Sequence, residues 1–233
     1  MAQTNSQKET PTQLRRRGRP FDHFEQSELT REQAIYAAQE IVRKDGLEAL
    51  TIIQLAEELR VSRAPIYKLF KSRQTLVDAV VDAILLQILD DLPDDSTDWR
   101  EALEAQALIS FKTFLEYPGF ASEMVRTGFP DREAGKLSSY RIAKTLLAAG
   151  CEEDKIPAFI LAVISLITGA APIFRGQQER YSEAEKSPQD KERFSARLGD
   201  TLPKQLMDFD TFRLALDVLL SGIENHVTRN PDD

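Results

Sequence analysis

The sequence contains few residues of the kinds that bind metals or form disulfides. Its single cysteine, Cys151, excludes an internal disulfide and a zinc site built from several thiolates. Two histidines, His23 and His226, are too few for a histidine-rich metal centre. We therefore expect neither a metal ion nor another cofactor.

The sequence also lacks an early apolar run and any strand-like alternation. The first thirty residues are polar and contain nothing resembling a signal peptide, so we expect a cytoplasmic protein. From Leu29 onward no stretch alternates apolar and polar residues with the period of two that a half-buried strand requires. Apolar residues recur instead at helical spacing, which predicts an all-α fold.

One segment allows two interpretations. Residues 156–174 carry no charge over 19 positions, which is the length of a transmembrane helix. The segment contains Pro157, Gly169 and Pro172, and no second segment of its kind occurs. A helix that is apolar on all sides also suits the centre of a bundle or a subunit interface. We favour this second interpretation and expect no membrane.

Charge is unevenly distributed along the chain. The net charge of −8 argues against a nucleic-acid partner if it is spread evenly. Residues 1–76, here called the head, carry 13 basic and 10 acidic residues, whereas residues 77–233, the body, carry 17 basic and 28 acidic residues. A head of net charge +3 on a body of −11 is compatible with DNA bound by the head alone.

Two short helices separated by a tight turn are predicted in the head. The first carries a complete apolar stripe at helical spacing, formed by Ile52, Leu55, Ala56 and Leu59. A break at Arg60 and Val61 follows, and the second helix is predicted from Ser62 to about Phe70. This is the helix-turn-helix pattern. A plain helical hairpin has the same spacing, so spacing alone leaves that alternative open.

Capping residues mark the ends of these helices. Two capping boxes are predicted, Thr30 with Gln33 before the first helix of the head and Thr51 with Gln54 before the second. The other signals are Gly46 as a left-handed C-cap, Ser62 as an N-cap with Pro65 in the first turn, and Ser72 at the start of a fourth helix that runs to about Leu89.

The stretch Leu47–Leu76 resembles the DNA-binding signature of the TetR (tetracycline-repressor-like) family. The resemblance covers about residues 29–78 and is carried by Gly46, Thr51, the segment 56–62 that ends in Arg-Val-Ser, and the segment 67–70. Two departures are Leu69, where the family often has His, and Arg73, where it usually has Lys. The resemblance implies a cytoplasmic homodimer, usually a repressor, which leaves its operator when a small molecule enters the C-terminal domain.

Three regions follow from this interpretation. Residues 1–28 are expected to form a disordered basic arm, residues 29–76 a three-helix helix-turn-helix domain, and residues 77–233 a helical ligand-binding and dimerisation domain. Arg17 and Arg19, in an Arg-Gly-Arg-Pro run with the composition of an AT-hook, either enter the minor groove or touch phosphates without specificity.

The residues expected to contact double-stranded DNA lie in and around the second helix of the pair. Arg63 is the candidate for bidentate readout of guanine, and Ala64 and Pro65 for thymine methyl groups. The remaining candidates position the protein on phosphates or sit at a helix start: Thr51, Ser62, Tyr67, Lys68 and Arg73.

The body is predicted to contain helices over 98–116, 122–127, 137–149, 157–174 and 211–227, with a long polar loop that includes a helical piece over 176–203. The last two helices are the candidates for the homodimer interface, as half of a four-helix bundle. The wall of a small-molecule pocket is predicted from the larger side chains of the middle helices: Phe111, Phe114, Met124, Phe129, Phe159 and Phe174.

Two rival functions have some support in the sequence. Asp90, Asp91, Asp94, Asp95 and Asp98 form a carboxylate cluster, but no nucleophile and base accompany it, so no catalytic residue is predicted and we do not expect an enzyme. The alternative function is a ligand-independent nucleoid-organising or division-linked DNA-binding protein, which would occupy many genomic sites without responding to a small molecule.

Overall fold

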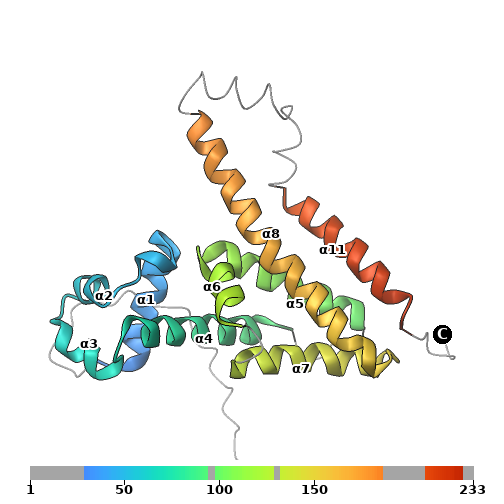
Figure 1. Cartoon of the computed structure of the whole chain (residues 1–233), viewed down its shortest axis with the longest axis horizontal. Helices are drawn as coiled ribbons and strands as arrows, with labels where there is room; N and C mark the ends of the chain where they lie inside the picture. Colours follow the sequence, from blue (N-terminus) through green and yellow to red (C-terminus); the bar gives the residue numbers. More distant parts are fainter. Residues whose placement is uncertain (1–28, 94–97, 129–131, 186–207, 228–233) are drawn as a thin grey trace, which may run out of the picture.

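The computed structural model describes residues 29–93, 98–128, 132–185 and 208–227 (Figure 1). Within these ranges the chain folds into α-helices joined by short connections, and the predicted all-α fold is confirmed. The helices are α1 (Arg31–Asp45), α2 (Ile52–Glu58), α3 (Arg63–Leu69), α4 (Arg73–Asp91), α5 (Trp99–Glu116), α6 (Phe120–Thr127), α7 (Glu133–Ala148), α8 (Ile156–Glu185) and α11 (Phe209–Glu224), with short 3-10 turns η1 (Leu47–Ala49) and η3 (Glu153–Lys155).

The head consists of α1, α2 and α3, which lie together at one end of the molecule in Figure 1. The capping box of α1 is confirmed, because the Thr30 hydroxyl accepts from the Gln33 amide and the Gln33 side chain accepts from the Thr30 amide. The box predicted for α2 is wrong in its second half. The Thr51 hydroxyl accepts from the Gln54 amide at 3.1 Å, but the Gln54 side chain donates to Asp45 instead.

Helix α4 connects the head to the body. Its capping box at Ser72 closes with Thr75, and the helix runs two residues beyond the predicted end. Its residues from Leu76 to Ile88 supply a buried row that packs against α1, α5 and α7. The predicted boundary between residues 76 and 77 therefore falls inside this one rigid helix.

Several predicted bounds in the body are wrong. The most important error concerns α8, which continues without interruption to Glu185, whereas a loop with a helical piece was predicted from Gly176. Pro172 lies inside this helix, as in the predicted span of residues 157–174. Helices α7 and α11 begin at Glu133 and Phe209, each earlier than predicted. In the head, Gly46 was predicted as a left-handed C-cap of the first helix; it has a positive φ of 86°, but its ψ of 165° is extended.

Helices α8 and α11 run side by side in opposite directions along one side of the body (Figure 1). By length and composition, the segment Glu153–Arg180 is apolar enough to cross a membrane, but the core helix of a soluble protein passes the same test. Only 22 % of the most apolar 18-residue stretch of this segment is buried. Much of the apolar surface of α8 is thus uncovered within one chain.

Candidate DNA-binding surface and ligand cavity

A tight turn orients α3 relative to α2. The Val61 amide donates to the Ala56 carbonyl at 3.0 Å, and the Arg60 amide donates to the Glu57 carbonyl at 3.1 Å. These two bonds form a Schellman motif, which requires a residue of positive φ just after the helix. Arg60 occupies that position with φ 54°, in the left-handed region that non-glycine residues seldom adopt.

Two buried side chains fix which face of α3 is exposed. Ile66 is fully buried and Phe70 is 1 % exposed, both in the core of the head. At the end of α3 the Arg31 guanidinium lies 4.6 Å from the centre of the Phe70 ring and donates to the Leu69 carbonyl at 3.1 Å. A cation at the carbonyl end of a helix is favourable. The opposite face of α3 is therefore held outward by its own core contacts.

Most of the residues predicted to bind DNA lie together on that outward face. Ser62, Arg63, Ala64, Tyr67 and Lys68 are exposed, and Pro65 is partly buried. Among the described residues, the Ser62 hydroxyl forms no cap hydrogen bond with α3, although its backbone has the extended conformation of an N-cap. Arg17 and Arg19 lie outside the described residues.

Arg73 has a structural role that the sequence did not reveal. Its Nε donates to the Leu50 carbonyl at 2.8 Å, and one terminal nitrogen donates to the carbonyls of Leu47 and Glu48 at 3.0 and 3.3 Å. These bonds join the start of α4 to the turn η1. Two of the three guanidinium nitrogens thus point into the head, which reduces what Arg73 can offer to a phosphate.

The head is attached to the body where η1 meets the connection between α5 and α6. The Leu47 amide donates to the Pro118 carbonyl at 2.8 Å, and a Cβ at Gly119 would approach the Leu47 Cβ to 3.2 Å. Beside this contact the Arg43 guanidinium donates to the Tyr117 hydroxyl at 2.5 Å, and Tyr117 donates to Gln87. Burial raises the pKa of Tyr117 above its ordinary value, although Arg43 opposes the shift.

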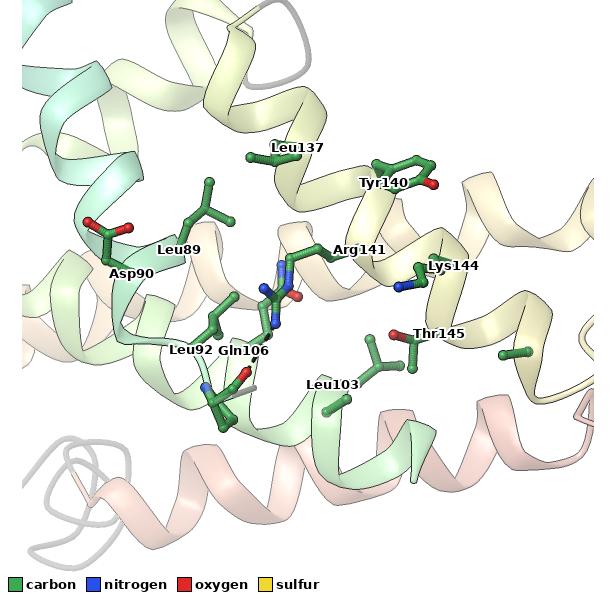
Figure 2. Close-up of a pocket in the computed structure, with 13 residues that line it drawn as sticks. Leu89, Asp90, Leu92, Leu103, Gln106, Leu137, Tyr140, Arg141, Lys144 and Thr145 are labelled. Carbon is green, nitrogen blue, oxygen red and sulfur yellow. Dashed lines mark hydrogen bonds between the residues drawn. The ribbon is translucent and has the colours of Figure 1, made fainter. Parts of the chain in front are cut away.

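A cavity of about 630 Å³ lies between the end of α4, the first turns of α5, and α7 (Figure 2). A smaller space of about 30 Å³ lies deeper and shares Leu89 and Gln106 with it. Gln106 is almost fully buried and donates to the Ser138 hydroxyl at 2.6 Å. The lining of the larger cavity combines leucines from three elements with Tyr140, Arg141, Lys144 and Thr145 of α7.

None of the described side chains predicted to line a ligand pocket lines the larger cavity. The Phe111 ring stacks on Phe212 with centroids 3.7 Å apart and meets the edge of Phe174 at 5.8 Å. The structure thus places Phe111 and Phe174 in the packing between α5, α8 and α11. Met124 is buried and Phe159 packs beside His226, whereas Phe114 lines the smaller space. Phe129 lies outside the described residues.

The sequence prediction missed the polar side of the larger cavity. Tyr140, Arg141 and Lys144 recur within two turns of α7, but charged residues on a helix usually face solvent, so this spacing gave no reason to select them. Only the packing of α4 and α5 against α7 shows that they surround a cavity.

These features define a helix-turn-helix protein whose DNA-binding head is joined by one helix to a larger helical domain. The comparisons agree with this class. Residues 34–80 match the profile of bacterial regulatory proteins of the tetR family. Over the head, the chain is therefore similar to the TetR family.

Three similar proteins indicate how far the likeness extends. The tetracycline repressor protein class C of Escherichia coli is 35% identical over 39% of this chain and 42% of its own length. The transcriptional repressor DrrR1 of Streptomyces coeruleorubidus is 26% identical over 84% of this chain and 77% of its own. The crystal structure of TetR from Acinetobacter baumannii is similar with a TM-score of 0.65 and 26% identity, covering 84% of this chain and 97% of that one. The chain therefore spans about two fifths of the first relative's length, where the likeness is strongest.

Proposed function

We propose that this protein is a cytoplasmic, sequence-specific transcriptional regulator that binds a palindromic operator as a homodimer. In this proposal it is a repressor and not an enzyme, and a small molecule in the body releases it from DNA. The outward face of α3 is the observation that carries the proposal. Its exposed Arg63, Tyr67 and Lys68 rest on a helix fixed from behind by the buried Ile66.

Each residue on this face suits a different contact in the major groove. The Arg63 guanidinium can pair bidentately with a guanine edge, and the small Ala64 can approach a thymine methyl group. Tyr67 and Lys68 are suited to phosphates, together with the Thr51 hydroxyl at the start of α2. Such contacts would set the register of α3 while Arg63 reads the sequence.

The uncovered apolar surface of α8 and α11 supports the homodimer. Leu161 is 65% exposed on α8, and Leu214 and Val218 are 65% and 67% exposed on α11. Large exposed apolar surfaces mark interaction sites, and identical surfaces pair in two-fold dimers. A second copy that pairs through these helices would form a four-helix bundle and hold two α3 helices about one DNA turn apart.

The position of the larger cavity supports regulation by a ligand. The cavity lies at the C-terminal end of α4, farther from the head. The N-terminal end of the same helix lies in the head, so α4 connects the cavity to the DNA-binding surface. A ligand that binds better to one orientation of α4 than to another would shift the spacing of the two heads.

Binding-site selection from random duplexes tests the DNA-binding proposal without knowledge of the operator. We expect an enriched inverted repeat whose half-sites lie about one helical turn apart. Arg63→Ala should weaken affinity about tenfold and relax the preference at one position of each half-site. Lys68→Ala should weaken binding to all sequences similarly and reduce the salt dependence by about one ion per half-site.

Lys136→Ala is the matched control, because Lys136 is an exposed cation on α7, away from the head. Equal losses for Lys68→Ala and Lys136→Ala, or the absence of any enriched sequence, would refute the assignment of α3. Many dispersed genomic sites without a small-molecule response would favour the nucleoid-organising alternative.

A further inference from the structure

We infer that the larger cavity and the smaller space together bind an uncharged apolar molecule with one small group that both donates and accepts hydrogen bonds, such as a primary amide. That group pairs with the Gln106 side chain, and the apolar part lies against the leucines of the larger cavity. This inference rests on the proposed function and specifies the ligand class of its regulatory site. It depends on the buried polar side chains around the smaller space.

Buried polar side chains gather around the smaller space. Four polar residues are buried in the parts of the chain that the structure describes, and three of them line this space: Gln106, Ser110 and Ser138. A buried polar group destabilises a protein unless it forms hydrogen bonds. Polar side chains beside an internal space therefore indicate that the space has a function.

Gln106 retains hydrogen-bonding capacity for a ligand. Its amide has two N–H donors and an oxygen with two lone pairs, and Nε2 donates to the Ser138 hydroxyl at 2.6 Å. The residue is only 6% exposed, and its Oε1 accepts no hydrogen bond from any of the described residues. This oxygen is not sealed off by protein atoms, and Gln106 lines both spaces (Figure 2). Oε1 and the second N–H can thus pair with one group that donates and accepts.

The smaller space suits a small polar group. Ser110 lies one turn beyond Gln106 on the same face of α5, and its hydroxyl forms no hydrogen bond within the described part of the chain. The volume of about 30 Å³ is that of one small group. The polar end of a ligand therefore fits at Gln106, while a longer apolar part does not fit in this space.

The charged residues of the larger cavity do not call for a charged ligand. The Arg141 guanidinium donates to the Pro93 carbonyl at 3.1 Å, and both Arg141 and Lys144 take part in further interactions within the protein. Asp90 contributes the opposite charge from the α4 side (Figure 2). Removing an ionised group from water is costly without a counter-charge that is available to it, so the site favours an uncharged molecule.

The walls of the larger cavity suit an apolar chain. Leucines from three helices and from the residue after α4 line it: Leu89, Leu92, Leu103 and Leu137. The volume of about 630 Å³ lies within the range of cavities that hold small molecules. Since Gln106 lines both spaces, an apolar chain can extend from it along these leucines.

A ligand held at Gln106 would contact the helix that enters the head. The smaller space is bounded on the α4 side by Leu85, Ile88 and Leu89, and on the α7 side by Ser138 among others. A group that pairs with Gln106 of α5 therefore packs against both neighbouring helices. Its binding would favour the arrangement of α4, α5 and α7 that fits it best.

Three probes of nearly identical shape test the hydrogen-bonding preference: octanamide, 2-nonanone and octanoate. Titration calorimetry on the full-length protein measures their affinities. We expect octanamide to bind about fivefold to tenfold more tightly than 2-nonanone, which lacks the N–H donor, and octanoate to bind most weakly. Transfer out of water alone would favour 2-nonanone, because a methyl group replaces the polar NH₂ group. Equal or tighter binding of 2-nonanone, tightest binding of octanoate, or no detectable binding of octanamide would overturn the inference.

Substitutions on α5 place the preference at Gln106. Gln106→Met keeps the length of the side chain without the amide, so octanamide and 2-nonanone should bind with about equal affinity. Gln106→Asn withdraws the amide by one methylene group and should reduce the preference at least about threefold, which keeps the test available if the Met variant does not fold. Thr113→Val is the matched control, because Thr113 is also buried on α5 but lines neither space. An unchanged preference in the Gln106 variants, or an equal loss in Thr113→Val, would contradict the assignment.

Mobility shifts on the same samples separate this inference from the proposed function. Failure to bind any selected duplex would refute the regulator while leaving a measured octanamide preference intact. DNA binding that is released by 2-nonanone or by octanoate, but not by octanamide, would retain the regulator and refute the ligand class.

Discussion

The head and the body differ in how completely one chain buries its apolar residues. In the head, Leu50, Leu55 and Ile66 are fully buried and close the core within a single copy. In the body, Leu161, Leu214 and Val218 leave about two thirds of their surface exposed on neighbouring helices. The difference indicates that the head can present α3 by itself, whereas the body is built to be covered by something else. In our account the body is covered by a second copy, and it sets the spacing of two heads.

The largest expected effect comes from placing a charge on the uncovered face of α8. Leu161→Asp would bury an unpaired carboxylate in the proposed interface, which costs about 3–5 kcal/mol when no partner is present. We expect the variant to be monomeric by light scattering at concentrations where the wild type is dimeric. DNA affinity should fall about 100-fold or more while the helical circular dichroism remains.

Val125→Asp is the matched control for this variant. Val125 is 70% exposed on α6, outside α8 and α11, so an added carboxylate should leave the mass unchanged there. A dimeric Leu161→Asp protein, or a wild-type protein that partitions into detergent micelles instead of dimerising, would break the comparison between head and body.

The head shows how much local sequence can determine. The starts of α1 and α4 follow from Thr30 and Ser72, because a capping box depends only on residues within one turn. The outward position of Tyr67 and Lys68 follows from the spacing of Ile66 and Phe70 in the core. The all-α class and the family resemblance were also predicted correctly from the sequence.

The body shows what local sequence cannot determine. Helix α8 was predicted to end near Phe174, but it continues past Pro172 to Glu185. The inward bonds of Arg73 and the cavity beside Arg141 join residues far apart along the chain, and no local pattern encodes such contacts. The residues predicted for a ligand wall were selected by size and spacing, which do not distinguish a cavity from a packed core; among them, Phe114 lines the smaller space.

The second largest expected effect, after that of Leu161→Asp, concerns the head alone. Arg73→Gln removes the hydrogen bonds to the carbonyls of Leu47 and Leu50, so we expect unfolding free energy to fall by about 1–3 kcal/mol in urea titrations. The mass of the protein should not change. If the inward bonds are the main role of Arg73, the salt dependence of DNA binding should also remain as in the wild type. A slope reduced by about one ion per head would show a phosphate contact as first predicted.

A smaller effect compares two identical motifs in the two regions. The helices α2 and α7 both end in a Schellman motif, but α2 places Arg60 at the positive-φ position, whereas α7 places Gly150 there with φ 82°. Arg60→Gly should raise the unfolding free energy by up to about 1 kcal/mol, because a left-handed non-glycine residue is strained. Arg60→Ala keeps the Cβ and should show no such gain. Equal stabilities of the two variants would show that Arg60 is unstrained.

The smallest expected effect is a pH dependence at the contact between α4 and α6. The Arg126 hydrogen bond holds the pKa of Glu123 below its ordinary value of 4.5, with a further contribution from Gln74 of α4. Since the folded-state pKa is lowered, this stabilisation is present above pH 4.5 and is lost as the pH falls through the lower pKa. The Arg126 side chain is 59% exposed although that of Glu123 is only 11% exposed, so solvent screens the pair and we expect a few tenths of a kcal/mol.

Urea titrations at pH 6 and at pH 3.5 on the wild type and Glu123→Gln isolate this contribution. The stability difference between the two proteins should shrink at the lower pH. A difference that is constant or grows on acidification would contradict the assigned sign.

The mass of the protein–DNA complex tests the central claim most directly. Analytical ultracentrifugation of the 26.3 kDa chain with a selected duplex should yield a complex containing two chains, with no appreciable one-chain intermediate. Shortening the duplex to one half-site should lower the affinity about 100-fold or more. The account would be contradicted if one chain bound the full duplex and if shortening the duplex to one half-site left the affinity unchanged. The uncovered face of the body would then have no part in recognising DNA.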